Sequence, residues 1–169
     1  VVLNMNNPDT WAAQANFLRH QAADAKNNGK WLVAGFHQSL YSGAAHIVDY
    51  GIISARKFWS PLFAELGVDL VLQGHDHVYL RTGVMNNNEV VQTKTKTITY
   101  GGRNYTAKLD PTGSIYVISG CSGVKTYVTK DPAETDKLFP RAEKLADAND
   151  PIFSAFQLLA IRSILTHTP

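Results

Sequence analysis

Two apolar runs that each stop at a histidine constrain the fold of this chain more than any other feature. Residues 30–36 precede His37, and residues 68–73 precede a Gly-His-Asp-His turn at 74–77. Continuous apolar runs of this length are typical of strands covered on both faces. Residues 52–66, between the runs, have the pattern of a helix. The order strand, helix, strand predicts an α/β fold with a largely parallel sheet, whose ligands bind beyond the carboxyl ends of the strands.

Further elements are predicted on either side of this unit. A short apolar run at residues 1–5 is expected to be a strand. Apolar residues at helical spacing over 11–22 predict a helix with a stop signal at residues 27–29. In the central helix, Gly67 is expected to be the cap, and Pro61 predicts a kink or a division into two shorter helices.

The remaining segments have neither a helical nor a buried-strand pattern. Residues 38–50 lack periodicity and are predicted to form a loop. Alternation over residues 90–100 and 114–119 predicts antiparallel strands and hairpins. The polar residues 131–150 are expected to be helical in pieces, whereas the apolar run within residues 155–169 has no explanation in this scheme.

Composition excludes several classes of protein. The net charge is +2 and the basic residues are scattered, with Lys94 to Lys96 the nearest approach to a basic run, so nucleic acid is not expected to be the main partner. No stretch reaches the roughly 20 apolar residues of a membrane span. Cys121 is the only cysteine, so an intramolecular disulfide is excluded and a buried, inert thiol is favoured. Because the chain opens on Val1-Val2-Leu3 inside the first predicted strand, we expect it to be part of a longer protein.

Three histidines are predicted to share one edge of the sheet. His37 follows one buried strand, and His75 and His77 follow the other. Imidazole is the commonest protein ligand for borderline metals, and Gly74 allows a sharp turn before the pair. A lone His-x-His pair is more often polar surface than a ligand set, but the two strand ends together favour a metal site.

These residues resemble a known family. Residues 36–42, Phe-His-Gln-Ser-Leu-Tyr-Ser, and residues 74–82, Gly-His-Asp-His-Val-Tyr-Leu-Arg-Thr, resemble the last two metal-binding motifs of the calcineurin-like metallophosphoesterases, in the purple-acid-phosphatase-like branch. The resemblance implies the C-terminal half of a four-layer αββα sandwich with a mixed sheet, incomplete as given. It assigns residues 1–130 to that half-domain and residues 131–169 to a polar helical segment and C-terminal extension of the same domain.

The resemblance also implies a chemistry. In that family two metal ions lie side by side and hydrolyse phosphoesters. By resemblance, His37 and His75 would bind one metal and His77 the other, with Fe, Zn or Mn as the candidates. His46 falls where purple acid phosphatases place a histidine near the phosphate, and its residue type leaves two alternatives open, a proton donor or a solvated loop histidine. A phosphoester small molecule is the implied substrate, and the implied location is extracellular or cell-surface.

The family's first three motifs have no counterpart in this sequence. They supply an Asp and a His, a second Asp that bridges the metals, and an Asn-His pair, whereas Asp9 lies in a turn without matching context. We therefore expect a metal-dependent phosphoester hydrolase in the longer parent, while this chain alone is inactive and holds no metal or one weakly bound ion. An exposed sheet surface is expected to favour a homo-oligomer.

Two alternative functions differ in class from this one. The first is a non-catalytic metallophosphoesterase-like binding domain. The second is an amidohydrolase, which is disfavoured because in those enzymes the His-x-His pair opens the first strand of the domain, and here it follows two strands.

Overall fold

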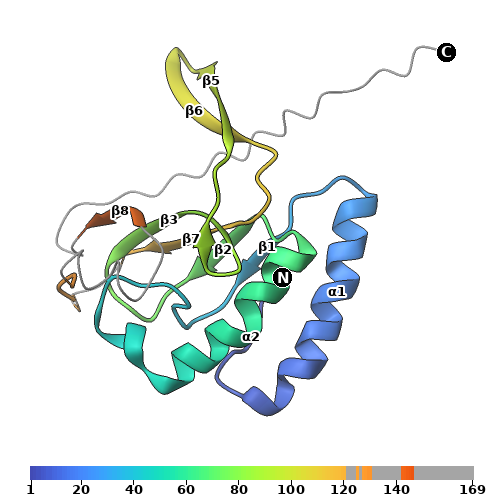
Figure 1. Cartoon of the computed structure of the whole chain (residues 1–169), viewed down its shortest axis with the longest axis vertical. Helices are drawn as coiled ribbons and strands as arrows, with labels where there is room; N and C mark the ends of the chain where they lie inside the picture. The colour runs from blue at the N-terminus through green and yellow to red at the C-terminus, as the bar shows by residue number, and fades with distance from the viewer. Residues whose placement is uncertain (121–124, 126, 131–141, 147–169) are drawn as a thin grey trace.

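A mixed sheet and two long helices make up the body of the molecule (Figure 1). This computed structural model describes residues 1–120, 125, 127–130 and 142–146. Its main sheet has the strand order β1-β2-β7-β3-β4, with β8 also paired to β3, and β5 and β6 form a separate two-stranded sheet. The elements are η1 (Pro8–Thr10), α1 (Trp11–Asn27), β1 (Val33–Gly35), η2 (Ala45–Val48), α2 (Tyr50–Leu66), β2 (Leu70–Gln73), β3 (Tyr79–Asn86), β4 (Glu89–Val90), β5 (Lys94–Tyr100), β6 (Arg103–Leu109), β7 (Ser114–Ser119) and β8 (Ala142–Ala146).

Parallel pairing aligns the two histidine-bearing strands. β1 and β2 are parallel, with Val33 opposite Leu70 and Gly35 opposite Leu72. β2 is also parallel to β7, whereas β3 is antiparallel to β7. The predicted α/β class is therefore confirmed, and the sheet is mixed.

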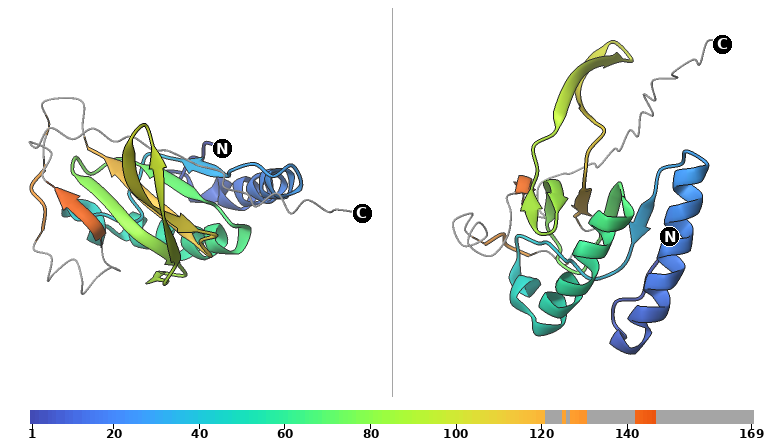
Figure 2. Two further views of the ribbon diagram at one scale, coloured as in Figure 1. Left: turned by 90° about the horizontal axis from the view of Figure 1, so that it is seen from above. Right: turned by 45° about the vertical axis from the view of Figure 1, so that its right-hand side comes forward.

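One face of the sheet is buried beneath α1 and α2, which lie side by side (Figure 2). Ala34, Val71 and Tyr116 are register partners on neighbouring strands, and all three are buried in the core together with Phe63 of α2. Burying a large apolar side chain contributes about 1.5–3 kcal/mol, so this layer holds the helices to the sheet. Leu72 faces the opposite side and is 40% exposed.

The helices follow the sequence pattern except at Pro61. α1 ends at Asn27 as the stop signal predicts, and Gly67 ends α2 in the left-handed conformation, with φ 68°. The predicted division of α2 at Pro61 is wrong, because the helix is continuous through it. An internal proline costs a helix about 3 kcal/mol, and burial of Trp59 and Phe63 on the same helix offsets that cost.

Four further expectations differ from the structure. β7 is antiparallel to β3 only and parallel to β2, because the chain crosses over to insert it between these strands. Ala142–Ala146 form a strand and not a helix, since pairing supplies the edge of β3 with backbone partners. In residues 1–5 only Val2 forms a bridge, to Gly35. The predicted loop 38–50 contains the short helix η2.

Several expectations concern positions outside the described residues. These are Cys121, residues 155–169 and the rest of 131–150. Among the described residues there is no helix with the length and apolar character needed to cross a membrane.

Gly51 and Gly67 form a matched pair for testing the effect of backbone conformation on stability. A Cβ at either position would meet no atom within 4 Å. Only Gly67 has a positive φ, of 68°. Gly51→Ala is expected to stabilise the fold by about 0.5–1 kcal/mol by restricting the unfolded chain. Gly67→Ala is expected to destabilise it by about 1–2 kcal/mol through left-handed strain. Urea unfolding measures both changes, and effects of the same sign would contradict the cap assigned to Gly67.

Candidate metal centre

The predicted ligands follow the carboxyl ends of β1 and β2. Beyond the strands, the Gly74 amide donates a hydrogen bond to the His37 carbonyl at 3.0 Å, which continues the pairing. A Cβ on Gly74 would lie 3.3 Å from that oxygen, tighter than most side chains approach. Position 74 therefore suits glycine, and the close approach puts His37 and His75 at the same edge of the sheet.

Three imidazole rings meet at this edge. His75 has a left-handed backbone, with φ 68°, and its Nδ1 lies 3.2 Å from Nε2 of His37. The ring of His46 comes from η2, and its centroid lies 4.2 Å from that of His75. The left-handed conformation costs a residue with a side chain about 1–2 kcal/mol. Such strain is concentrated at functional sites, where the surrounding structure enforces it.

Asp49 adds a carboxylate to this cluster. Its Oδ2 lies 2.8 Å from Nδ1 of His46. One donor atom each from His46, Asp49 and His75 lie within 4.8 Å of one another. A role for Asp49 in orienting a histidine was not favoured from the sequence, although its place three residues after His46 was a usable signal, because one helical turn brings such residues together.

His77 contacts a second group of residues, which includes Lys125 and Tyr127. Its Nδ1 is 2.6 Å from the carbonyl oxygen of Lys125, and its ring stacks on Tyr127 with centroids 5.0 Å apart. The Tyr127 ring also lies 5.8 Å from that of His46. Tyr127 is therefore a common neighbour of the two histidines, and neither Tyr127 nor Lys125 was predicted to be part of the site.

The cluster has the donor chemistry of a site for one transition-metal ion. Two nitrogens bound tetrahedrally at about 2.0–2.1 Å lie about 3.4 Å apart, and the nitrogens of His37 and His75 are 3.2 Å apart. Imidazole and carboxylate donors together suit Zn, Mn and Fe. The residues present therefore fit one ion, which His37 and His75 would hold, and His46 and Asp49 would be further candidate donors. Their assignment as ligands remains a prediction.

Burial lowers the pKa of His75 below its ordinary value, and the neighbouring His46 and His37 lower it further. The carboxylates of Asp76 and Asp49 act in the opposite direction. The net effect favours the neutral imidazole, which is the form that binds metal.

The side chain of Arg56, on α2, forms hydrogen bonds to the backbone of the His46 loop, which is defined as residues 38–49. Its Nε donates to the carbonyl of Leu40, and its Nη2 donates to that of Ile47 at 3.2 Å. Burial lowers the pKa of Arg56 to about 10, so the side chain is still cationic at neutral pH. Hydrogen bonds to a charged group contribute about 1.5–3 kcal/mol each. Both ends of the loop are thus fixed to the helix.

Two polar residues in and after β2 fix the same loop from another side. Gln73 accepts from the amide of Leu40 at 2.8 Å and donates to the carbonyl of Tyr41 at 2.5 Å. Ser42 donates to Oδ2 of Asp76, whose side chain is 1% exposed. Asp76 stands between His75 and His77 in the sequence, so this bond links the loop directly to the histidine turn. None of these polar contacts was predicted from the sequence.

Comparison with known structures supports the fold assignment. The structure of a purple acid phosphatase from yellow lupin (Lupinus luteus) seeds is similar, with a TM-score of 0.52 and 22% sequence identity, over 69% of this chain and 20% of that one. At this identity the likeness concerns the fold. The chain has the sheet and helix arrangement of part of that structure, which confirms the predicted partial α/β sandwich with a mixed sheet.

Sequence comparison gives a shorter match. No family model matches the chain. Two similar proteins are uncharacterised proteins of Mycobacterium tuberculosis, from strains CDC 1551 / Oshkosh and ATCC 25618 / H37Rv, each 34% identical over 86 residues. The match covers 48% of this chain and 16% of each relative, so it spans about a sixth of their length.

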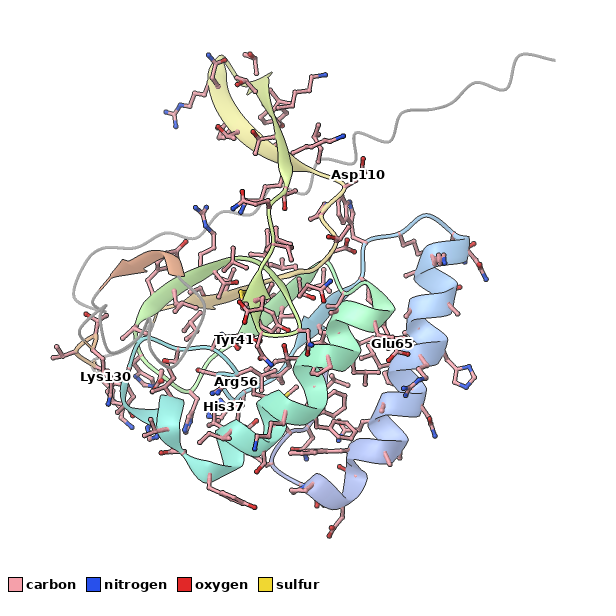
Figure 3. The ribbon with its side chains drawn as sticks, in the orientation of Figure 1. His37, Tyr41, Arg56, Glu65, Asp110 and Lys130 are labelled. Atoms are coloured by element: carbon pink, nitrogen blue, oxygen red, sulfur yellow. The ribbon has the colours of Figure 1, made fainter. Side chains whose placement is uncertain are left out.

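Substitution of Arg56 by Met is expected to destabilise the fold by about 2 kcal/mol or more, because two buried loop carbonyls lose their donor. Arg19→Met is the matched control: Arg19 lies 3.9 Å from Glu65 in an exposed ion pair, labelled at Glu65 in Figure 3. That change is expected to cost less than about 1 kcal/mol. Urea unfolding compares the two variants, and equal losses would contradict the role of Arg56.

Proposed function

We propose that this chain forms part of a metal-dependent phosphoester hydrolase, with its metal centre at the β1–β2 edge. The observation that carries the proposal is the convergence of three imidazoles from two strand ends and one loop. Ligand sites in such sheets lie beyond the carboxyl ends of the strands. The fold is similar to that of a purple acid phosphatase, and this similarity supports the proposal of phosphoester hydrolysis at this edge.

His37 and His75 are the proposed ligands of one ion, and His77 of a second. His77 suits this role because its Nδ1 is bonded to the Lys125 carbonyl at 2.6 Å, which leaves Nε2 for a metal. Metal-bound histidines usually have their second nitrogen held in this way. When bound, paired Fe, Zn or Mn ions polarise a phosphoryl group and acidify water at neutral pH.

His46 is the proposed proton donor to the leaving alkoxide. Its Nδ1 is held by Asp49 at 2.8 Å, which fixes the ring and leaves Nε2 to face a substrate. Proton transfer by a positioned side chain contributes about 10²–10⁴-fold to a rate. The competing role is that of a metal ligand, since His46 and Asp49 lie within donor distance of His75.

Full activity is proposed to need ligands from outside this sequence. Among the described residues, the metal-ligand cluster contains a single carboxylate, that of Asp49, whereas two adjacent ions need negative groups to neutralise their charge. This chain alone is proposed to bind at most one ion. A phosphoester small molecule is the proposed substrate, and the likeness to a purple acid phosphatase is the basis for proposing an extracellular or cell-surface location. The self-association predicted from the sequence is not supported by these observations.

His75→Ala is expected to abolish Zn²⁺ and Mn²⁺ binding by this chain, because His75 belongs both to the pair with His37 and to the cluster with Asp49. Isothermal titration calorimetry measures the affinity. His20→Ala, which removes an exposed imidazole from α1, is the matched control and should leave binding unchanged. Equal binding by wild type and His75→Ala would refute the proposed centre.

In an active longer form of the protein, His46→Ala is expected to slow hydrolysis of alkyl phosphates by about 10²–10⁴-fold. It should affect p-nitrophenyl phosphate far less, because p-nitrophenolate leaves without a proton. The comparison is of kcat/KM for the two substrates, with metal affinity measured alongside. An equal loss on both substrates, together with weaker metal binding, would assign His46 as a ligand instead.

A further inference from the structure

The hairpin of β5 and β6 has one basic and aromatic face. Strand pairing places Ile98 opposite Tyr105 and Tyr100 opposite Arg103. Because side chains alternate between faces along a strand, Lys94 and Lys96 lie on the same face as Ile98. The basic face, as defined here, consists of Lys94, Lys96, Ile98, Tyr100, Arg103 and Tyr105.

This face is exposed, and the hairpin has no acidic residue that would neutralise its positive charge. Residues 94–109 contain no Asp or Glu. Its three cations are exposed to solvent, and Tyr100 and Tyr105 are 56% and 42% exposed. The other face is mostly uncharged hydroxyl and amide side chains, namely Thr95, Thr97, Thr99, Asn104 and Thr106, with Lys108. Cations and aromatic rings are therefore gathered on one side of the ribbon.

The hairpin extends away from the body of the molecule, as Figures 1 and 2 show. β5 and β6 pair only with each other in the described structure. Gly101 and Gly102 have φ values of 55° and 73°, as a tight two-residue turn requires. In Figure 3 Asp110 lies at the base of the hairpin, far from His37. The basic face is thus separate from the candidate metal centre.

We propose that the basic face docks on a membrane surface that contains anionic phospholipid. A broad surface contacts side chains from both strands at once, whereas a strand added to one edge of the hairpin would pair with β5 or β6 alone. Each Lys or Arg close to an anionic bilayer contributes attraction, and tyrosine favours the interface between water and lipid. The hairpin supplies both kinds of side chain on the same face.

Two other interpretations explain fewer features of this surface. Lysines on a free edge strand protect a sheet against unwanted pairing, but that role does not explain two exposed tyrosines beside them. Single-stranded nucleic acid also contacts cations and aromatic rings, but it is usually held in a basic groove. The hairpin is a two-stranded ribbon, and in the described structure no further strand lies beside it to form such a groove.

Co-sedimentation of the metal-free chain with lipid vesicles tests the proposal. Binding is expected to vesicles of phosphatidylcholine and phosphatidylserine at low salt, and not to phosphatidylcholine alone. Lys94→Gln/Lys96→Gln is expected to weaken binding about 25-fold, because each cation near such a surface contributes about fivefold in affinity. Lys26→Gln/Lys57→Gln is the matched control: it removes the same charge from exposed positions on α1 and α2 and should bind within about threefold of wild type.

Several outcomes would overturn the proposal. These are absence of binding by wild type, equal binding to neutral vesicles, and equal losses in the hairpin and control variants. Binding to single-stranded DNA with the same dependence on Lys94 and Lys96, but not to vesicles, would assign the face to nucleic acid instead. Far-ultraviolet circular dichroism establishes that both variants are folded. Since no metal is added, the result is independent of the proposed hydrolase function.

Discussion

The parallel pairing of β1 with β2 is the constraint on which the rest of the structure depends. Gly35 lies opposite Leu72, and the bond from Gly74 to His37 extends this register past the strand ends. A shift of one residue would turn every buried side chain of a strand to the opposite face. Burial of Ala34 and Val71 under the helices therefore fixes the register. The same register makes neighbours of two histidines that are 38 positions apart in the sequence.

Buried polar groups, and not apolar packing alone, place the third histidine. The His46 loop is bonded to Arg56 of α2, to Gln73 of β2 and to Asp76 in the histidine turn. Burying such groups is unfavourable unless their hydrogen bonds are made. Hydrogen bonds are directional, so a loop secured by them has one favoured arrangement, whereas an apolar contact tolerates sliding. The ring of His46 reaches His75 because the loop is fixed at several points along its length.

The sequence predicted the features that depend on periodicity and on the order of elements. The two buried strands, both long helices and the shared edge of His37 and His75 are of this kind, because parallel topology alone puts strand ends together. Arg56 and Asp76 could not be found in this way, since their partners are backbone and side-chain groups set by tertiary contacts. The place of β7 beside β2 was missed for a related reason. Alternation identifies a strand but does not say which strands will be its neighbours.

The histidine edge gathers three imidazoles around a strained backbone. His75 is held in a strained left-handed conformation in contact with two other imidazoles, and its pKa is lowered first by burial and then by those neighbours. Burial and this proximity therefore disfavour the protonated form of His75. A cation placed among the ring nitrogens would turn the same proximity into attraction. The core and the buried polar bonds compensate for the strain, so the energetic cost of gathering these side chains is met during folding.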